Sequence, residues 1–150
     1  MTSRTPSRKQ ARRDALFVLY QREVTDAPLA TLLERRAESE SYHLDEFTER
    51  SVAGVIAGQP ALDDELTANS PAWPLARIAP LERSILRLAL WELRSGETPP
   101  EVAIDEAVRL AKRYSTDEAA ALVNGILAGA LRSGGGSGAR AAGDAKGERE

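Results

Sequence analysis

The chain has 150 residues and a net charge of −3, with 20 Lys and Arg residues against 23 Asp and Glu residues. It has no cysteine and a single histidine, His43, which excludes disulfides and thiolate chemistry and nearly excludes a zinc site. The length suits one compact domain. No apolar run approaches the roughly 20 residues that span a membrane, so we expect a cytoplasmic protein without a secretory signal or a membrane partner.

Positive charge is concentrated at the start of the chain. Residues 1–13 contain five cations and no acid: Arg4, Arg8, Lys9, Arg12 and Arg13. A basic arm (residues 1–13) on an otherwise acidic body predicts a localised anion site rather than general attraction to polyanions. The alternative is a solvated terminus that frays and binds nothing.

Apolar residues recur at intervals of three and four along most of the chain, which predicts an all-α fold. The expected domain covers residues 1–132, and the Gly-rich tail at residues 133–150 predicts disorder. The helix at residues 80–95 has the widest apolar arc and should be central. The expected helices span residues 7–24, 28–38, 44–58, a stretch that starts at Pro60, and residues 80–95, 98–114 and 115–132.

Local signals mark the last two helices. Thr98 with Glu101, and Ser115 with Glu118, have the spacing of capping boxes. Gly125 and Gly129 lie four residues apart on one face of the last helix. Because a glycine inside a helix costs about 1 kcal/mol relative to alanine, we expect a neighbouring segment to approach closely there.

The first helix carries the best candidate for a binding site, since enzyme motifs are scarce and His43 has no evident catalytic partners. Arg8 and Arg12 are near enough to reach around its amino-terminal end. Cations that meet phosphates, beside rings that stack on exposed bases, are typical of single-stranded nucleic-acid sites. The alternative is that the aromatic rings belong to the core. One face of this helix combines Lys9, Arg13, Phe17 and Tyr20.

Three stretches resemble the NusB family of transcription antitermination factors. They are ARRDALFVLYQ, LERSILRLALWEL and PPEVAIDEAVRLAKRYSTDEAAALVNGIL; residues 25–79 match loosely and the tail not at all. The resemblance implies about seven helices arranged as two three-helix bundles. It also implies a non-enzymatic protein without cofactor or metal. Its partners would be boxA-type RNA of ribosomal RNA leaders, the small-subunit ribosomal protein NusE and the RNA polymerase antitermination complex.

The resemblance also assigns site residues. The arginine-rich start of the family maps to Arg8, Lys9, Arg12 and Arg13, and its tyrosine maps to Tyr20. Two acids follow, Glu82 and Glu118, which either accept from base amino groups or serve helix starts, where a carboxylate meets unpaired N–H groups. We favour the second role, and both can coexist. Leu122 departs from the aromatic residue of some members, and a stacking role for Phe17 is inferred from this sequence alone.

Other functions compete with antitermination. One is a protein–protein adaptor of the transcription or ribosome assembly machinery with an incidental basic arm. Another is a ribosomal-RNA cytosine methyltransferase, because some of these enzymes use the same fold to bind RNA. That enzyme needs a catalytic cysteine, which this chain lacks. Some family members self-associate, and the sequence does not decide whether this chain forms a homodimer.

Overall fold

The computed structural model describes residues 5–134, and these residues form six α-helices and one short 3-10 helix without any strand. The predicted all-α class is therefore confirmed. None of the helices in this part of the chain is long and apolar enough to cross a membrane. The elements are α1 (Arg8–Val24), α2 (Leu29–Glu40), α3 (Glu46–Ala68), η1 (Leu75–Arg77), α4 (Pro80–Ser95), α5 (Pro100–Tyr114) and α6 (Asp117–Gly134).

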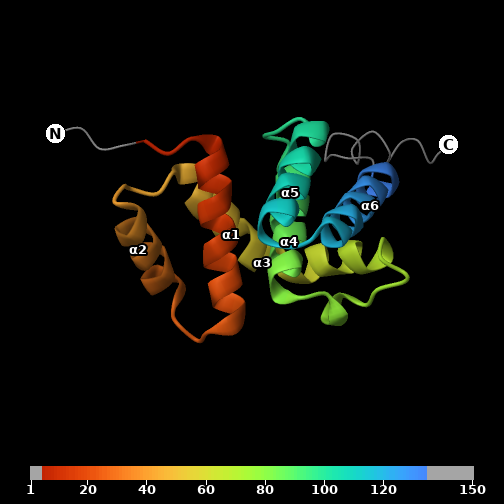
Figure 1. Ribbon diagram of the computed structural model, residues 1–150, viewed down its shortest axis with the longest axis horizontal. Helices are drawn as coiled ribbons and strands as arrows, with labels where there is room; N and C mark the ends of the chain where they lie inside the picture. Colours follow the sequence, from red (N-terminus) through yellow and green to blue (C-terminus); the bar gives the residue numbers. More distant parts are fainter. Residues whose placement is uncertain (1–4, 135–150) are drawn as a thin grey trace.

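The helices form two groups of three, α1 to α3 and α4 to α6, and the two groups share one hydrophobic core. Figure 1 shows α1 and α2 at one end of the molecule, α5 and α6 at the other, and α3 and α4 between them. As predicted, the helix that begins at Pro80 is central, because α4 packs against α1, α3, α5 and α6. Arg4 and residues 135–150 lie outside the described residues, so the predicted disorder of the tail is not tested there. Ser133 and Gly134, which we assigned to the tail, belong to α6.

The prediction of separate helices on the two sides of Pro60 is wrong. α3 is continuous from Glu46 to Ala68 and contains Pro60 in its interior. Proline removes one amide donor and strains the turn before it, which usually ends or kinks a helix. Pro60 lies on the exposed side of α3, while Leu62 and Leu66 are buried. Packing of the buried side thus holds the helix together, and the described residues contain one α-helix fewer than the seven expected.

Both predicted capping boxes are absent. The hydroxyl of Thr98 donates to a buried carboxylate described below, and α5 begins at Pro100 without a side-chain cap. Ser115 likewise turns toward α4. The cap of α6 lies one residue later, where the hydroxyl oxygen of Thr116 accepts from the amide of Ala119 at 3.0 Å. A hydroxyl beside a charged acceptor makes the stronger, charge-assisted bond, which explains why the local pattern was misleading.

An ion-pair network joins the end of α1 to α3 and α4. Arg83 and Arg87 of α4 both donate to Glu23, at 2.6 and 2.9 Å, and Arg87 also donates to Asp63 at 2.8 Å. Burial alone would raise the pKa of Glu23, but the hydrogen bonds and charges of Arg83 and Arg87 outweigh it and lower the pKa below 4.5. The ionised form of Glu23 therefore stabilises this junction.

We predict that Glu23→Gln lowers the free energy of unfolding at neutral pH and has progressively less effect in acid. The folded-state pKa is depressed, so the contribution is complete above the unfolded value of 4.5 and is lost as pH falls toward the folded value. Urea unfolding of both proteins between pH 3 and 7 measures the difference. A difference that stays constant below pH 4.5 would contradict the assignment to this carboxylate.

The two glycines of α6 differ. A Cβ at Gly129 would lie 2.9 Å from the amide oxygen of Asn69, whereas nothing lies within 4 Å of a Cβ at Gly125. The expected close approach is confirmed at Gly129 and wrong at Gly125.

We predict that Gly125→Ala raises the free energy of unfolding by about 0.5–1 kcal/mol, and that Gly129→Ala raises it less because Asn69 must move. Urea unfolding of both variants is the measurement, and equal gains would refute the distinction.

Candidate nucleic-acid interface

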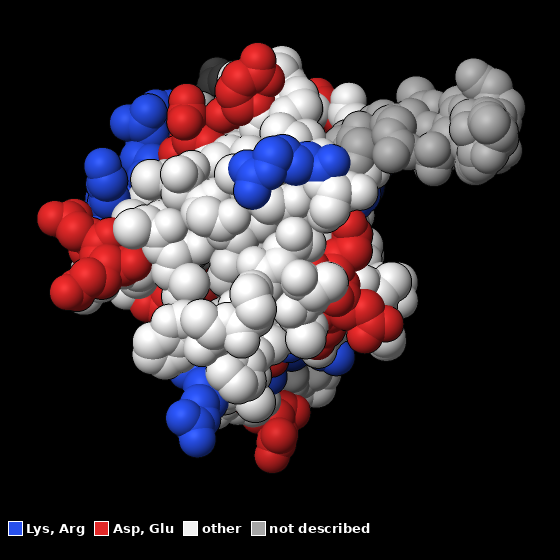
Figure 2. Space-filling model, turned by 90° about the vertical axis from the view of Figure 1, so that its right-hand side faces the viewer, with Lys and Arg blue, Asp and Glu red and all other residues white. Residues whose placement is uncertain are grey.

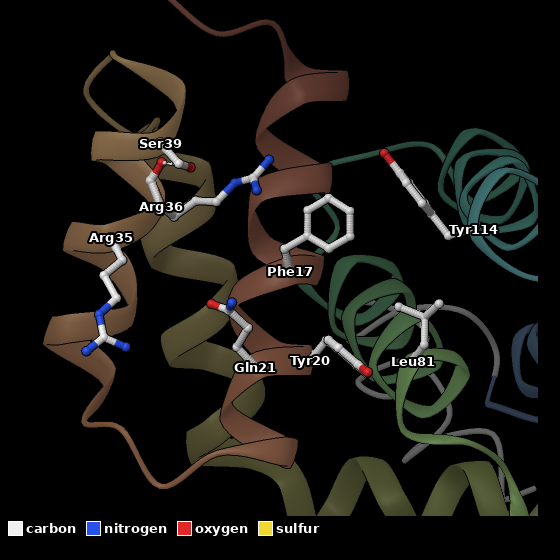
Figure 3. A pocket seen from close by; sticks show the side chains of 8 residues that line it. All are labelled: Phe17, Tyr20, Gln21, Arg35, Arg36, Ser39, Leu81 and Tyr114. Atoms are coloured by element: carbon white, nitrogen blue, oxygen red, sulfur yellow. Dashed lines mark hydrogen bonds between the residues drawn. The ribbon is translucent and has the colours of Figure 1, made fainter.

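A cavity of about 590 Å³ opens between α1, α2, the start of α4 and the end of α5 (Figure 3). We call it the aromatic hollow. Its volume lies within the roughly 300–1,000 Å³ of typical small-ligand sites, so a group the size of one nucleotide fits. The lining residues are Phe17, Tyr20, Gln21, Arg35, Arg36, Ser39, Leu81 and Tyr114.

Three aromatic side chains line the hollow. Phe17 and Tyr114 meet edge to face, with ring centroids 5.0 Å apart and an interplanar angle of 76°. Both rings are partly buried and also pack against the hydrophobic core. Tyr20 is partly buried one turn further along α1. The ring of Phe17 thus packs on the core, as one interpretation expected, and it also lines the hollow; its stacking on RNA stays a prediction.

Arg36 of α2 is held over the ring of Phe17. Its guanidinium carbon lies 4.8 Å from the ring centroid. The guanidinium donates to the fully buried Asp14 at 2.7 Å and pairs with Glu40 at 3.0 Å. The hydroxyl of Tyr42 donates to the other oxygen of Asp14 at 2.7 Å, and burial together with this negative partner raises the pKa of Tyr42. These bonds fix α2 against α1 and set the wall of the hollow.

Lys9 and Arg13 lie on the same side of α1 as the hollow, as predicted, and each has an acidic neighbour. The ammonium group of Lys9 is 3.9 Å from Glu106 of α5, and its side chain is 63% exposed. The guanidinium of Arg13 is 3.7 Å from Glu40. Lys9 is exposed, but Glu106 is only 14% exposed and the side chains of Arg13 and Glu40 are 22% and 25% exposed, so both ion pairs are partly shielded from water. A phosphate group that binds Lys9 or Arg13 therefore competes with these carboxylates.

Arg8 and Arg12 face the other side of α1. Arg12 is only 6% exposed, and its Nε donates to both carboxylate oxygens of Glu92 at 3.0 and 3.1 Å. The hydroxyl of Thr98 donates to the same carboxylate at 2.5 Å. Arg8 is exposed, with its guanidinium 4.3 Å from the ring centroid of Phe47. Arg12 is therefore a structural residue in this fold, and we remove it from the expected phosphate contacts.

The two predicted acids occupy the first turns of α4 and α6, but neither caps a main-chain amide within residues 5–134. Glu82 accepts a hydrogen bond from the hydroxyl of Ser115, which ties the start of α4 to the end of α5. Its second oxygen is buried without a hydrogen-bond partner among these residues. Glu118 is exposed on α6. Leu122 is partly buried and packs on the core.

Two cations near the hollow were missed. Arg35 is exposed and lines the hollow from α2. Arg113 is exposed at the end of α5, with its guanidinium 5.3 Å from the ring centroid of Tyr114. The adjacency of Arg113 and Tyr114 is a cation–ring signal that the sequence does contain. Arg35 has no such signal, because the α2 region has only a weak pattern.

The end of the molecule formed by α6 lacks the combination of rings and cations that the hollow has. Figure 2 shows the middle of this face as largely uncharged apart from Lys or Arg atoms near its upper middle, with both acidic and basic side chains along its rim. Trp73, in the loop between α3 and α4, is 50% exposed. Within residues 5–134, no group of three or more His, Asp or Glu side chains could hold a metal ion. Rings and cations thus converge at the hollow and not at this face.

The family profile described as the NusB family matches residues 9–132 of this chain. The transcription antitermination protein NusB of Rubrobacter xylanophilus is 44% identical over 125 residues, which cover 83% of this chain and 89% of the relative. The chain belongs to the NusB family. The resemblance found in its sequence is therefore confirmed.

Solved structures agree with the NusB assignment. NusB from T. maritima superposes with a TM-score of 0.76 at 32% identity, covering 86% of this chain and 93% of that structure. A chain from a crystal structure of the antitermination factors NusB and NusE in complex with dsRNA gives a TM-score of 0.77 at 24% identity, covering 84% and 96%. The second likeness concerns the fold alone. Both place the helices described above in the NusB fold.

We predict that Arg12→Ala lowers the free energy of unfolding by about 3–5 kcal/mol, because it leaves the Glu92 carboxylate buried without its cation. Arg8→Ala removes only an exposed cation–ring contact and should cost about 0.5–1 kcal/mol. Urea unfolding monitored by circular dichroism measures both. Similar costs for the two variants would show that the Arg12–Glu92 pair has no special structural role.

Proposed function

We propose that this chain is a transcription antitermination factor that binds boxA-type RNA of ribosomal RNA leaders together with NusE. The observation that carries the proposal is its 44% identity, over 83% of the chain, to a transcription antitermination protein NusB. The activity is binding and not catalysis. It takes place in the cytoplasm, on nascent RNA within the RNA polymerase antitermination complex.

A solved assembly supports the choice of partners. It contains the antitermination factors NusB and NusE in complex with dsRNA, and its NusB-like chain has the fold of this protein. Because the likeness in sequence to that chain is limited, the residues that contact NusE here are left unassigned. The face at the α6 end is largely uncharged, and it is therefore a poor surface for RNA (Figure 2).

The aromatic hollow supports single-stranded RNA as the ligand. A duplex keeps its bases stacked on one another, whereas an unpaired base can leave the stack and meet a protein ring. Phe17, Tyr20 and Tyr114 provide the rings at the hollow. Lys9 and Arg13 follow the same side of α1 and supply cations for the backbone phosphates.

A gel-shift titration with single-stranded RNA from a ribosomal RNA leader, with and without NusE, tests the function. We expect weak, salt-sensitive binding of the RNA by this chain alone and tighter binding when NusE is added, because a few phosphate contacts give little affinity. A scrambled RNA and a duplex of the same sequence are the controls. Retention of NusE with no preference for the leader RNA would instead indicate a protein–protein adaptor.

We predict that Tyr20→Ala weakens binding of the leader RNA by about 1–3 kcal/mol, the usual contribution of one ring stacked on a base. Trp73→Ala is the matched control, because Trp73 is an exposed aromatic residue outside the hollow. Fluorescence anisotropy with labelled RNA measures both affinities, and circular dichroism confirms folding. Equal losses in the two variants would exclude a specific role for Tyr20.

A further inference from the structure

We propose that the aromatic hollow holds one unstacked nucleotide of the RNA and that Arg35 and Arg113 bind the phosphates beside it. The inference rests on the proposed RNA-binding function and adds two residues outside the basic arm. Part of the electrostatic contact with the RNA would then lie on α2 and at the end of α5, in addition to the start of α1.

Most cations of the basic arm are already engaged. Arg12 is buried against Glu92, and Arg8 lies on the ring of Phe47. Lys9 and Arg13 have acidic neighbours at 3.9 and 3.7 Å. Phosphate binding by the arm alone is therefore partly offset by carboxylates, and further cations are needed near the rings.

Arg35 is such a cation. It lines the hollow from α2, its side chain is exposed, and it makes no ion pair with any of residues 5–134. The next residue, Arg36, is tied to Asp14 and Glu40 and lies over Phe17. Figure 3 shows the two arginines diverging from α2, with Arg36 directed toward Phe17 and Arg35 directed away from it. The pair thus divides its roles, since Arg36 builds the wall and Arg35 is available to a ligand.

Arg113 approaches the hollow from the opposite side. It is exposed, pairs with no acid within residues 5–134, and places its guanidinium 5.3 Å from the ring centroid of Tyr114. Figure 3 shows Tyr114 across the hollow from α2. An RNA strand that crosses from α2 to α5 would therefore meet, on each side of the rings, a guanidinium without an acidic partner among residues 5–134.

The surface of the hollow between Arg35 and Arg113 suits a nucleotide base. Phe17 and Tyr114 form a fixed edge-to-face corner, because Arg36 and the core hold Phe17 in place. Gln21 adds an amide that can both donate to and accept from a base edge. A base stacked on a ring flanked by cations is the usual arrangement for single-stranded RNA. The cavity volume admits one such nucleotide and not a base-paired helix.

The first experiment measures the salt dependence of RNA affinity for Arg35→Gln and Arg113→Gln. The probe is labelled single-stranded RNA from a ribosomal RNA leader, titrated by anisotropy at several KCl concentrations with NusE present. Each variant should lower the slope of log affinity against log salt by about 0.7 in magnitude, as expected for one lost phosphate contact on a single strand. At fixed salt, affinity should fall about two- to fivefold.

Arg132→Gln is the matched control, because Arg132 is an exposed arginine of α6 without an ion pair in the described part of the chain. Its slope should equal that of the wild type. Wild-type binding with unchanged slopes for Arg35→Gln and Arg113→Gln would overturn this inference and leave the proposed function intact. Failure of the wild-type protein to bind the RNA, even with NusE, would overturn both.

A second experiment locates the base. RNAs that carry 2-aminopurine at one position at a time are mixed with the wild type and with Tyr114→Leu, which keeps an apolar side chain but removes the ring. We expect one position whose fluorescence is quenched by the wild type, with the quenching lost in Tyr114→Leu and the salt slope retained. Quenching that is spread evenly, or that persists in the variant, would overturn the assignment of the hollow as the base site.

Discussion

Two buried anchors on α1 set the orientation on which the candidate site depends. Arg12 is fixed to Glu92 of α4, and Asp14 is fixed to Arg36 of α2. Successive residues of a helix are turned by roughly 100°, so anchoring positions 12 and 14 on two sides directs Arg13 to the intervening side of α1, where Glu40 of α2 lies. Phe17 follows one turn later on the same side. Desolvated ion pairs tolerate little displacement, because an unpaired buried charge is costly, and α1 is therefore held in one rotation.

The same anchors explain why three separate helices can form one rigid surface. The α2 helix has only one fully buried apolar residue, Leu32, so the bonds among Arg36, Asp14 and Tyr42 add to the packing that holds it in place. The end of α5 is tied to α4 through Ser115 and Glu82. Polar contacts of this kind fix direction as well as distance, which is what a preorganised stacking site requires.

Sequence patterns predicted the helices and the family well, but not the roles of individual charges. The spacing of apolar residues is a local property of the sequence, and it correctly identified α4 as the central helix. Arg12 and Arg13 look alike in the sequence, and the acid that separates their roles, Glu92, is 80 residues away from Arg12. The rule that proline ends a helix was overridden at Pro60 by buried residues further along α3. The role proposed for Arg35 could not be recognised in the sequence, because only the packing of α2 beside α1 places this residue at the hollow.

The carboxylates of Glu40 and Glu106, which neighbour Arg13 and Lys9, have a consequence for selectivity. They partly neutralise Lys9 and Arg13, so a strand of DNA or transfer RNA gains less from these two cations than their charges alone would give. Only a ligand whose bases also reach the rings recovers the cost of displacing those acids. Such a surface would remain vacant among the abundant polyanions of a cell until the intended transcript emerges.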